Sequence, residues 1–397
     1  MSKRVAITGM GIVSAIGNSV AENFDSLKNG KIGIGKISLF ETRHQNEILV
    51  GEVKMSNVEL ENSLHLPHSH NYTRTALLGA FAVKQALQQA NITDCNDKKT
   101  AFISSTSVGG MDFTEKYFYE YFENTEIERF ITSHDAGHAS HEIAELIGLE
   151  GLVTTISTAC SSAANAIMLG ARLIKSGRAE RVIVGGTDAL SKFTINGFKT
   201  LMILSDTYNT PFDDNRKGLN LGEAAAYLVL EAEEVALAAG KNILAYVAGY
   251  GNANDAFHQT ASSENGDGAY LAMEKALKVA QILPEAVDYI NAHGTATPNN
   301  DLSEGRALIR AFGDKVPAFS STKAFTGHTL AAAAAIEAVY SVLAIQNQCI
   351  YPNLNFKTPM QEFHLIPETK FVSAPIKTVL SNSFGFGGNC STIIFTK

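Results

Sequence analysis

The 397-residue sequence has few prolines, few cysteines and no long apolar run. With only 9 prolines, 45% hydrophobic and 18% charged residues, its composition excludes disorder for most of the chain and predicts a large buried core. The four cysteines form no Cys-x-x-Cys pair, and such sparse use predicts reduced thiols in the cytoplasm. No apolar run reaches the about 18 uninterrupted residues that indicate a membrane span.

Clusters of basic residues are also missing. The chain has 32 Lys and Arg against 40 Asp and Glu, a net charge of −8, and no dense basic run. This excludes nucleic acid and anionic membrane as partners. Two basic residues precede the apolar stretch that starts at Val5, but Gly9 and Gly11 interrupt it and no Ala-x-Ala site follows. A buried first strand is therefore favoured over a signal peptide.

Short β-branched runs alternate with longer helical patterns, which predicts an α/β fold with strands buried between helices. A second series starts near residue 243, where 245–251 (AYVAGYG) repeats the Gly-x-Gly spacing of 5–11 (VAITGMG). We therefore predict two related halves, 1–240 and 241–397, without a Pro- or Ser-rich linker between them. The aromatic and acidic segment 116–129 lacks periodicity and is predicted to be a surface or interface excursion.

Cys160 lies in the segment 157–162 (STACSS), between an apolar strand pattern and a helix of small residues. The helix dipole and the free N–H groups at a helix N-terminus lower the pKa of a thiol, which favours a nucleophilic thiolate. A cysteine packed in the core is the alternative.

Three further segments follow strand patterns. His293 begins 293–298 (HGTATP), where an imidazole beside hydroxyls suits an amide-bearing ligand, with a structural histidine in a capped turn as the alternative. His328 ends 323–328 (KAFTGH) before an alanine-rich helix, where a buried Glu337 must be paired or bind a cation unless the helix emerges there. The glycines of 381–389 (SNSFGFGGN) allow close backbone approach, with an N–H as oxyanion donor and a ring as gate.

Two other patterns favour no function. His134, His138 and His141 fit no zinc signature, so a metal site there is disfavoured. The Gly9-x-Gly11 pair lacks the third glycine and the ribose-binding acid of a dinucleotide fingerprint, so nicotinamide binding is disfavoured too.

Together, TACSS, HGTATP, KAFTGH and NSFGFGG, in this order, closely resemble the β-ketoacyl-acyl-carrier-protein synthases, the elongating and decarboxylating condensing enzymes of the thiolase superfamily. The resemblance covers nearly the whole chain. It implies a thiolase-like duplicated αβαβα layered fold and a dimer with an identical or a related ketosynthase-like subunit. The implied acyltransferase reaction joins an acyl group on the enzyme cysteine to malonyl-acyl-carrier protein, giving CO2 and 3-oxoacyl-acyl-carrier protein without a cofactor of its own.

The resemblance also implies a role for each site residue. Cys160 accepts the acyl chain, while His293 and His328 bind the malonyl thioester carbonyl and stabilise the enolate. Lys323 pairs with Glu304 and orients the histidine side of the site. The other implied roles are the N–H groups of Cys160 and Phe386 as oxyanion hole, Phe384 and Phe386 at the gate, Thr295 and Thr297 as phosphopantetheine ligands, and Asn291, Glu337, Ser381 and Asn382 around a structural Na or K ion.

The middle of the chain departs from the family pattern. The segment 204–213 is shortened and lacks the customary arginine, Leu219 replaces an aromatic residue, and Ala331 and Ala334 replace glycines. This favours, as an alternative to fatty-acid elongation, a specialised polyketide- or aryl-polyene-type ketosynthase. A non-catalytic chain-length subunit is a further alternative, although such subunits usually lose the cysteine.

Two finer expectations concern the substrates. Arg74 is predicted to lie near the entrance and to bind an acidic carrier protein. His138 and His141 lie on the segment 136–143, which in relatives lines the acyl pocket of the dimer partner. Their polar nitrogens predict a pocket for unsaturated, aromatic or partly polar chains.

Overall fold

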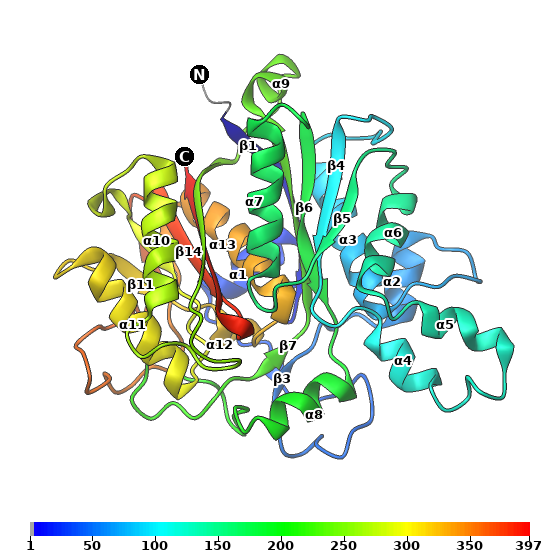
Figure 1. The fold of residues 1–397 in the computed structure, drawn as a ribbon, viewed down its shortest axis with the longest axis horizontal. Coiled ribbons are helices and arrows are strands. Elements are labelled where there is room, and N and C mark those ends of the chain that lie inside the picture. Colours follow the sequence, from blue (N-terminus) through cyan, green and yellow to red (C-terminus); the bar gives the residue numbers. More distant parts are fainter. Residues whose placement is uncertain (1–3) are drawn as a thin grey trace.

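Ten strands form one continuous mixed sheet in the computed structural model, which describes residues 4–397 (Figure 1). Their order across the sheet is β11 (Ala318–Ser320), β10 (Tyr289–Asn291), β14 (Thr378–Phe384), β15 (Asn389–Thr396), β9 (Ala245–Asn254), β1 (Val5–Ser14), β8 (Ala224–Ala232), β6 (Arg181–Asp188), β4 (Thr100–Ser105) and β5 (Val153–Ile156). Shorter strands form a second sheet of β2 (Ile34–Gly35), β3 (Val50–Gly51) and β7 (Leu221–Gly222), and a pair of β12 (Cys349–Ile350) and β13 (Val372–Ser373).

The two halves of the large sheet repeat one pattern of strand pairing. From β1 outward, β8 and β6 pair antiparallel, and β4 and β5 then pair parallel. From β9 outward, β15 and β14 pair antiparallel, and β10 and β11 then pair parallel. The predicted duplication is therefore confirmed in the fold. The division of the chain at residue 240 stays a prediction, because β1 also pairs with β9 and joins the halves.

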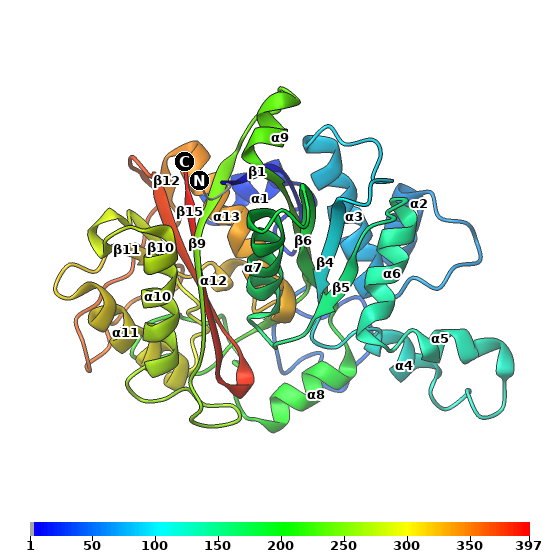
Figure 2. The ribbon, with the colours of Figure 1, turned by 45° about the horizontal axis from the view of Figure 1, so that its top comes forward.

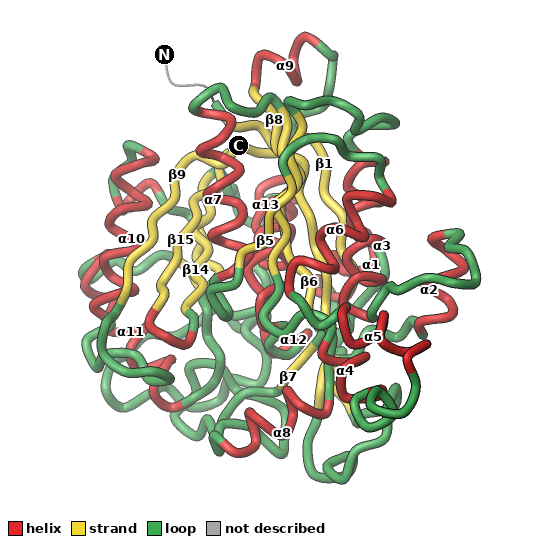
Figure 3. The backbone as a smooth tube through the Cα atoms, turned by 45° about the vertical axis from the view of Figure 1, so that its right-hand side comes forward, coloured by secondary structure: helices red, strands yellow, loops and turns green. Residues whose placement is uncertain are grey.

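Helices form the other layers. In the outer layers, α3 (Arg74–Gln89) packs on β1 and β8, and α10 (Asp267–Ala280) packs on β9 and β15. Between them, α7 (Ser162–Lys175) and α13 (Ala333–Asn347) contact strands of both halves, as Figures 2 and 3 show. The other helices are α1 (Val20–Lys28), α2 (Asn57–Leu64), α4 (Met111–Tyr117), α5 (Glu128–Thr132), α6 (Ala136–Leu146), α8 (Lys192–Thr200), α9 (Glu233–Ala238), α11 (Pro298–Phe312) and α12 (Lys323–Thr326).

The repeated Gly-x-Gly spacing has a packing reason. A Cβ atom on Gly11 would lie 2.0 Å from the carbonyl oxygen of Ala82 in α3. A Cβ atom on Gly251 would lie 2.0 Å from the carbonyl oxygen of Ala272 in α10. The glycines thus let an outer helix lie directly on the first strand of each half, and they do not interrupt β1.

One helical stretch, Leu330–Asn347, is long and apolar enough to cross a membrane by composition. In the fold, however, 89% of it is buried, and it includes α13 between the two halves. Its apolar character therefore serves the core of the protein.

The predicted excursion is confirmed as a surface feature. The helices α4 and α5 extend away from the body of the molecule (Figure 2). Tyr117 and Phe130 stack at 4.6 Å between ring centroids, which holds the two helices together. Tyr119 and Phe122 remain 85% and 75% exposed.

Candidate active site

Cys160 lies in the turn between β5 and α7 and is only 5% exposed. The preceding residue, Ala159, has a φ of +52°, which bends the chain sharply before the helix. The Ser162 hydroxyl accepts a hydrogen bond from Thr158 N (2.8 Å) and donates one to Ala159 O (2.5 Å). Small polar side chains in TACSS therefore fix the turn that carries the thiol.

The glycine-rich loop after β14 lies directly against this turn. A Cβ atom on Gly385 would lie 2.8 Å from Thr158 O and 3.2 Å from Cys160 N. Further along, Asn389 Oδ1 accepts from Ser161 Oγ (2.7 Å) and from Asn165 Nδ2 (2.9 Å). These contacts hold the loop in place, and the N–H of Phe386 lies at the Cys160 sulfur.

The pKa of Cys160 differs from the sequence prediction of a lowered value. Burial raises the pKa of the thiol to about 11, although the charge of Lys323 and the N–H groups of Phe386 and Cys160 act to lower it. The dipole of the local helix favours the thiolate, but the surrounding fold removes water from the sulfur. The loss of solvation disfavours the thiolate more strongly than the dipole favours it. The free enzyme therefore holds a protonated thiol.

His293 follows β10 and is held through its backbone by Glu304 of α11. The Glu304 carboxyl accepts hydrogen bonds from His293 N (2.9 Å), from Gly294 N (2.8 Å) and from Asn382 Nδ2 (3.2 Å). Burial raises the pKa of this carboxyl to about 7. Glu304 therefore fixes the position of the HGTATP loop.

The predicted pairing of Lys323 with Glu304 is wrong. Lys323 of α12 forms an ion pair with Glu337 of α13, and the two side chains are 2% and 1% exposed. Glu304 is already occupied by the N–H groups of the histidine loop. Glu337 is thus buried and paired, as a carboxylate on an apolar helix must be.

His328 follows α12 and faces His293 across the site. Its backbone N–H donates to Asn220 O (2.7 Å), and its carbonyl accepts from Gly222 N (2.9 Å). The two imidazole rings lie 5.4 Å apart at 87°, edge to face. Two buried imidazoles from separate strand ends are thus directed to one place.

Both histidines are held in the neutral form. Burial, followed by the charge of Lys323, lowers the pKa of His293 and of His328 well below the ordinary value. A neutral imidazole has one N–H to donate, and the Nδ1 atom of each ring is buried without a partner in the described structure. The pair can therefore act as hydrogen-bond donors without carrying charge.

A pocket of about 380 Å³ brings these groups together. Cys160, His293 and His328 line it with both gate residues, Phe384 and Phe386. Thr295 and Thr297 also line it, with their hydroxyls 2.9 Å apart. The predicted nucleophile, histidine pair, gate residues and threonines thus share one cavity.

Comparison with known proteins agrees with this geometry. The β-ketoacyl synthase N-terminal domain matches residues 2–236, and the C-terminal domain matches residues 244–357. The chain belongs to the β-ketoacyl synthase family. The "3-oxoacyl-[acyl-carrier-protein] synthase 2" of Staphylococcus aureus (strain N315) is 34% identical to this synthase over 411 residues, covering 100% of this chain and 99% of the relative.

Two solved structures show the same fold over the full length of both chains. The ishigamide ketosynthase/chain length factor has a TM-score of 0.94 and 30% sequence identity to this β-ketoacyl synthase. The AntDE:AntF structure, a type II PKS acyl-carrier protein in complex with its ketosynthase, has a TM-score of 0.88 and 30% identity.

The structural cation around Asn291, Glu337, Ser381 and Asn382 stays a prediction. Asn291 is fully buried and both its amide atoms lack a partner in the described structure, so its oxygen is free to act as a ligand. Glu337 is paired with Lys323, and Asn382 Oδ1 accepts from Thr392 Oγ1 at 2.7 Å. Two of the four predicted ligands, Glu337 and Asn382, thus already have protein partners.

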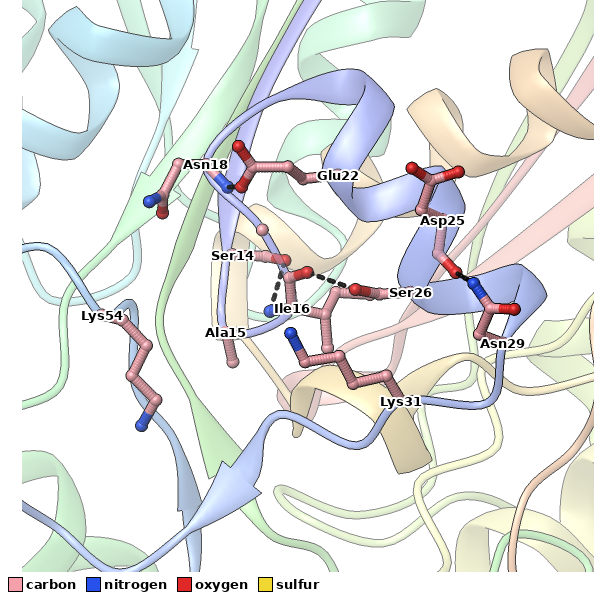
Figure 4. Close-up of a pocket in the computed structure, with 11 residues that line it drawn as sticks. Ser14, Ala15, Ile16, Asn18, Glu22, Asp25, Ser26, Asn29, Lys31 and Lys54 are labelled. Atoms are coloured by element: carbon pink, nitrogen blue, oxygen red, sulfur yellow. Dashed lines mark hydrogen bonds between the residues drawn. The ribbon is translucent and has the colours of Figure 1, made fainter.

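A second cavity, of about 450 Å³, lies near the start of α1 and away from Cys160 (Figure 4). Asp25, Lys31 and Lys54 line it, and Glu22 binds the backbone N–H of Asn18 at 2.8 Å. Its lining holds no cysteine or histidine. Its lining residues are therefore different from those of the Cys160 pocket.

Sequence reasoning missed three residues that support the site. Asn165 of α7 and Asn252 of β9 join Asn389 in one hydrogen-bond network behind the nucleophile turn. Asp188, at the end of β6, accepts from Ser107 N and from Ala331 N just after the His328 loop. Two of these residues had a signal in the sequence: Asn165 is an amide in a helix of small residues, and Asp188 is an acid at the end of an apolar strand.

Arg74 does not lie at the entrance. It is 7% exposed and forms a bidentate ion pair with Glu223, with Nη2–Oε1 and Nε–Oε2 distances of 2.6 and 2.9 Å. Its remaining donors bind the side chain of Asn57 and two backbone carbonyls. Arg74 therefore stabilises the fold and is not available to a carrier protein.

The placement of His138 and His141 at the acyl pocket of a dimer partner stays a prediction, because the structure holds one chain. His138 Nε2 donates to Asn71 O at 3.1 Å, and His141 is exposed on the surface of α6. The donor of His138 is therefore satisfied within its own chain. It gives no reason to expect a polar acyl pocket.

Proposed function

We propose that this β-ketoacyl synthase catalyses the decarboxylating Claisen condensation of an acyl group, carried on Cys160, with malonyl-acyl-carrier protein. The products are 3-oxoacyl-acyl-carrier protein and CO2. The observation that carries this proposal is one pocket lined by a buried thiol and two neutral histidines. A non-catalytic chain-length subunit is disfavoured because all three groups are present.

In the first half-reaction, the Cys160 sulfur attacks the carbonyl carbon of an acyl thioester, and the carrier thiol leaves with the proton. The negative oxygen of the tetrahedral intermediate is placed to accept from the N–H groups of Cys160 and Phe386, which already lie at the sulfur. Because burial favours the neutral thiol, the sulfur must lose its proton during the attack.

In the second half-reaction, the malonyl group loses CO2 and leaves an enolate. The N–H groups of His293 and His328 stabilise the enolate oxygen, and the carbanion then attacks the acyl-Cys160 carbonyl. The Cys160 thiolate leaves and takes up a proton from the solvent, because the proton of the free thiol left with the carrier thiol in the first half-reaction. Neutral histidines suit this step because a donor is needed where negative charge develops, and burial, followed by the charge of Lys323, keeps them neutral.

Thr295 and Thr297 would bind the phosphopantetheine amides in the outer part of the pocket. Phe386 would gate the inner part, and its ring stacks on Phe198 of α8 at 5.9 Å. The carrier protein itself is a partner of the synthase. The four cysteines form no disulfide in the described residues, which supports action in the cytoplasm.

The second subunit would pair along β5. This strand is outermost in the large sheet, its residues are half-buried, and its free edge offers unpaired backbone groups to another chain. Nearby Leu152 is 51% exposed. The second subunit is either an identical copy or a related ketosynthase-like subunit. Light scattering of the purified synthase, alone and with co-expressed related subunits, separates the homodimer from the heterodimer.

A specialised polyketide- or aryl-polyene-type pathway is the second candidate. The shortened segment 204–213 and the high similarity to the ishigamide ketosynthase/chain length factor favour it. Mass spectrometry of the acyl group trapped on Cys160 in the host distinguishes the pathways. A saturated chain supports fatty-acid elongation, and a polyenoyl or aryl-acyl chain supports the specialised pathway.

The reaction itself is tested by reconstitution with acyl- and malonyl-acyl-carrier protein. Stoichiometric CO2 and a 3-oxoacyl product support the proposal. Release of CO2 without any carbon–carbon bond formation by the wild-type dimer contradicts it.

A further inference from the structure

The mouth of the Cys160 pocket has an unusually apolar wall. Met202 is 88% exposed and Leu201 is 42% exposed, and both line the pocket just after α8. The loop between Asp255 and Thr260, two residues that also line the pocket, carries Phe257, which is 62% exposed. We call these three side chains, Leu201, Met202 and Phe257, the apolar rim.

Met202 is held in an unfavourable backbone conformation. Its φ is +56°, in the left-handed region that residues with a side chain adopt at a cost. The Met202 N–H donates to Lys199 O at 3.0 Å, which ends the helix at this point. The turn therefore keeps a large apolar side chain directed into solvent beside the pocket.

The basic side chains beside the mouth are mostly engaged. Lys199 pairs with Glu47, and Arg306 pairs with Glu264 at 2.7 Å. Arg216 donates to the carbonyl oxygens of Asp213 (3.0 Å) and Pro298 (2.8 Å). The two ion pairs leave Lys199 and Arg306 little net charge to offer a partner, whereas Arg216 keeps its charge and holds Pro298 at the pocket.

Two lysines differ from the others. Lys217 and Lys192 are exposed and form no ion pair in the described structure. Lys192 lies at the far end of α8 from Met202, a separation of about 15 Å along a helix. Lys217 lies two residues before Leu219, which lines the pocket, so it provides a direct test of electrostatic docking.

We propose that the apolar rim is the docking surface for the carrier protein, which binds by apolar contact more than by charge. The inference rests on the proposed function. A pocket of about 380 Å³ admits a phosphopantetheine arm but not a protein domain, so the carrier must cover the mouth while its thioester reaches Cys160. The surface it covers includes the rim, because Leu201 and Met202 line that pocket.

The test measures the Kd of fluorescently labelled holo-acyl-carrier protein from the source organism. Met202→Glu and, independently, Phe257→Glu should weaken binding about tenfold, the loss of about 1.4 kcal/mol typical of an apolar anchor. Leu237→Glu is the matched control: Leu237 is 61% exposed on α9, at the opposite end of the molecule from α8 (Figure 1), and this change should leave Kd unaltered.

Salt separates apolar from charged docking. Raising the ionic strength from about 0.1 to about 1 M shortens the Debye length from about 10 to about 3 Å, and the wild-type Kd should change less than about twofold. Unaltered binding by both rim variants overturns the proposal. So does a loss of affinity in Lys217→Glu that disappears at high salt while the rim variants bind normally.

A second assay tests the proposed function independently of carrier-protein docking. Wild-type synthase is given malonyl-pantetheine thioester, which needs the pocket but no docked protein. Failure to decarboxylate it contradicts the proposed function, while the Kd values still decide the role of the rim. In turnover, Met202→Glu should raise KM for malonyl-acyl-carrier protein far more than KM for malonyl-pantetheine.

Discussion

The ammonium group of Lys323 and the carboxylate of Glu337 form an ion pair beneath the active site, with both side chains almost fully shielded from water. Burial, followed by the charge of Lys323, lowers the pKa of His293 and of His328, while at Cys160 burial raises the pKa and the charge of Lys323 opposes this rise. The pair thus connects the packing of α13 to the protonation of all three reacting groups.

Breaking this pair should destabilise the protein. Lys323→Met and Glu337→Gln should each lower the free energy of unfolding by about 3–5 kcal/mol, because each leaves one buried charge uncompensated. The double variant should recover most of that loss. Denaturant unfolding measures the free energy of unfolding of the two single variants and of the double variant. If the single variants were as stable as the wild type, they would not leave a buried charge uncompensated.

The same double variant should change the pH dependence of decarboxylation. Without the positive charge of Lys323, the pKa of His293 and of His328 rises, so the histidines become protonated at a higher pH as the solution is acidified. The acid limb of the malonyl decarboxylation profile should therefore move to higher pH. Glu337→Gln alone keeps the lysine charge and should move the limb the other way.

Cys160→Ala should abolish condensation but leave malonyl decarboxylation measurable. The nucleophile and the histidines come from separate loops, after β5, β10 and α12, and the enolate needs only the histidines. Assays of CO2 release and of 3-oxoacyl product provide the comparison, with His328→Ala as the reference. Equal loss of decarboxylation in both variants would show that these roles are wrong.

Gly385→Ala should slow acylation of Cys160. The added Cβ would lie 2.8 Å from Thr158 O, so the loop that carries the Phe386 N–H must move away from the sulfur. Gly197→Ala in α8 is the matched control, because no atom lies within 4 Å of its added Cβ. Intact-protein mass spectrometry follows acylation; equal rates in both variants would mean that the loop can move without cost.

Arg74→Met should reduce stability without altering docking. Removing the guanidinium leaves Glu223 buried and unpaired, which should cost about 3–5 kcal/mol. Thermal unfolding measures this loss, and the Kd for the carrier protein, at low and high salt, should match that of the folded wild type. A salt-dependent change in Kd would return Arg74 to the docking surface.

Local sequence determined a large part of this structure. The strand patterns before three of the motifs are confirmed, because TACSS follows β5, HGTATP follows β10 and NSFGFGG starts within β14. These features depend on neighbours in the chain: alternation of apolar residues, small residues in the turn at Cys160, and glycines where two backbones meet. Local patterns thus predicted the junctions that carry Cys160, His293 and His328, while the roles of these residues followed from the resemblance of their motifs to the family.

Only the tertiary structure decided which buried charges pair and how they titrate. Glu304 and Glu337 both lie on helices beside the site, and spacing alone could not show that the first binds N–H groups and the second binds Lys323. The position of Arg74 at the start of a helix predicts an exposed side chain, but its ion pair with Glu223, 149 residues away in the chain, buries it. The pKa of Cys160 follows the same rule, because burial by distant segments of the chain outweighs the dipole of its own helix.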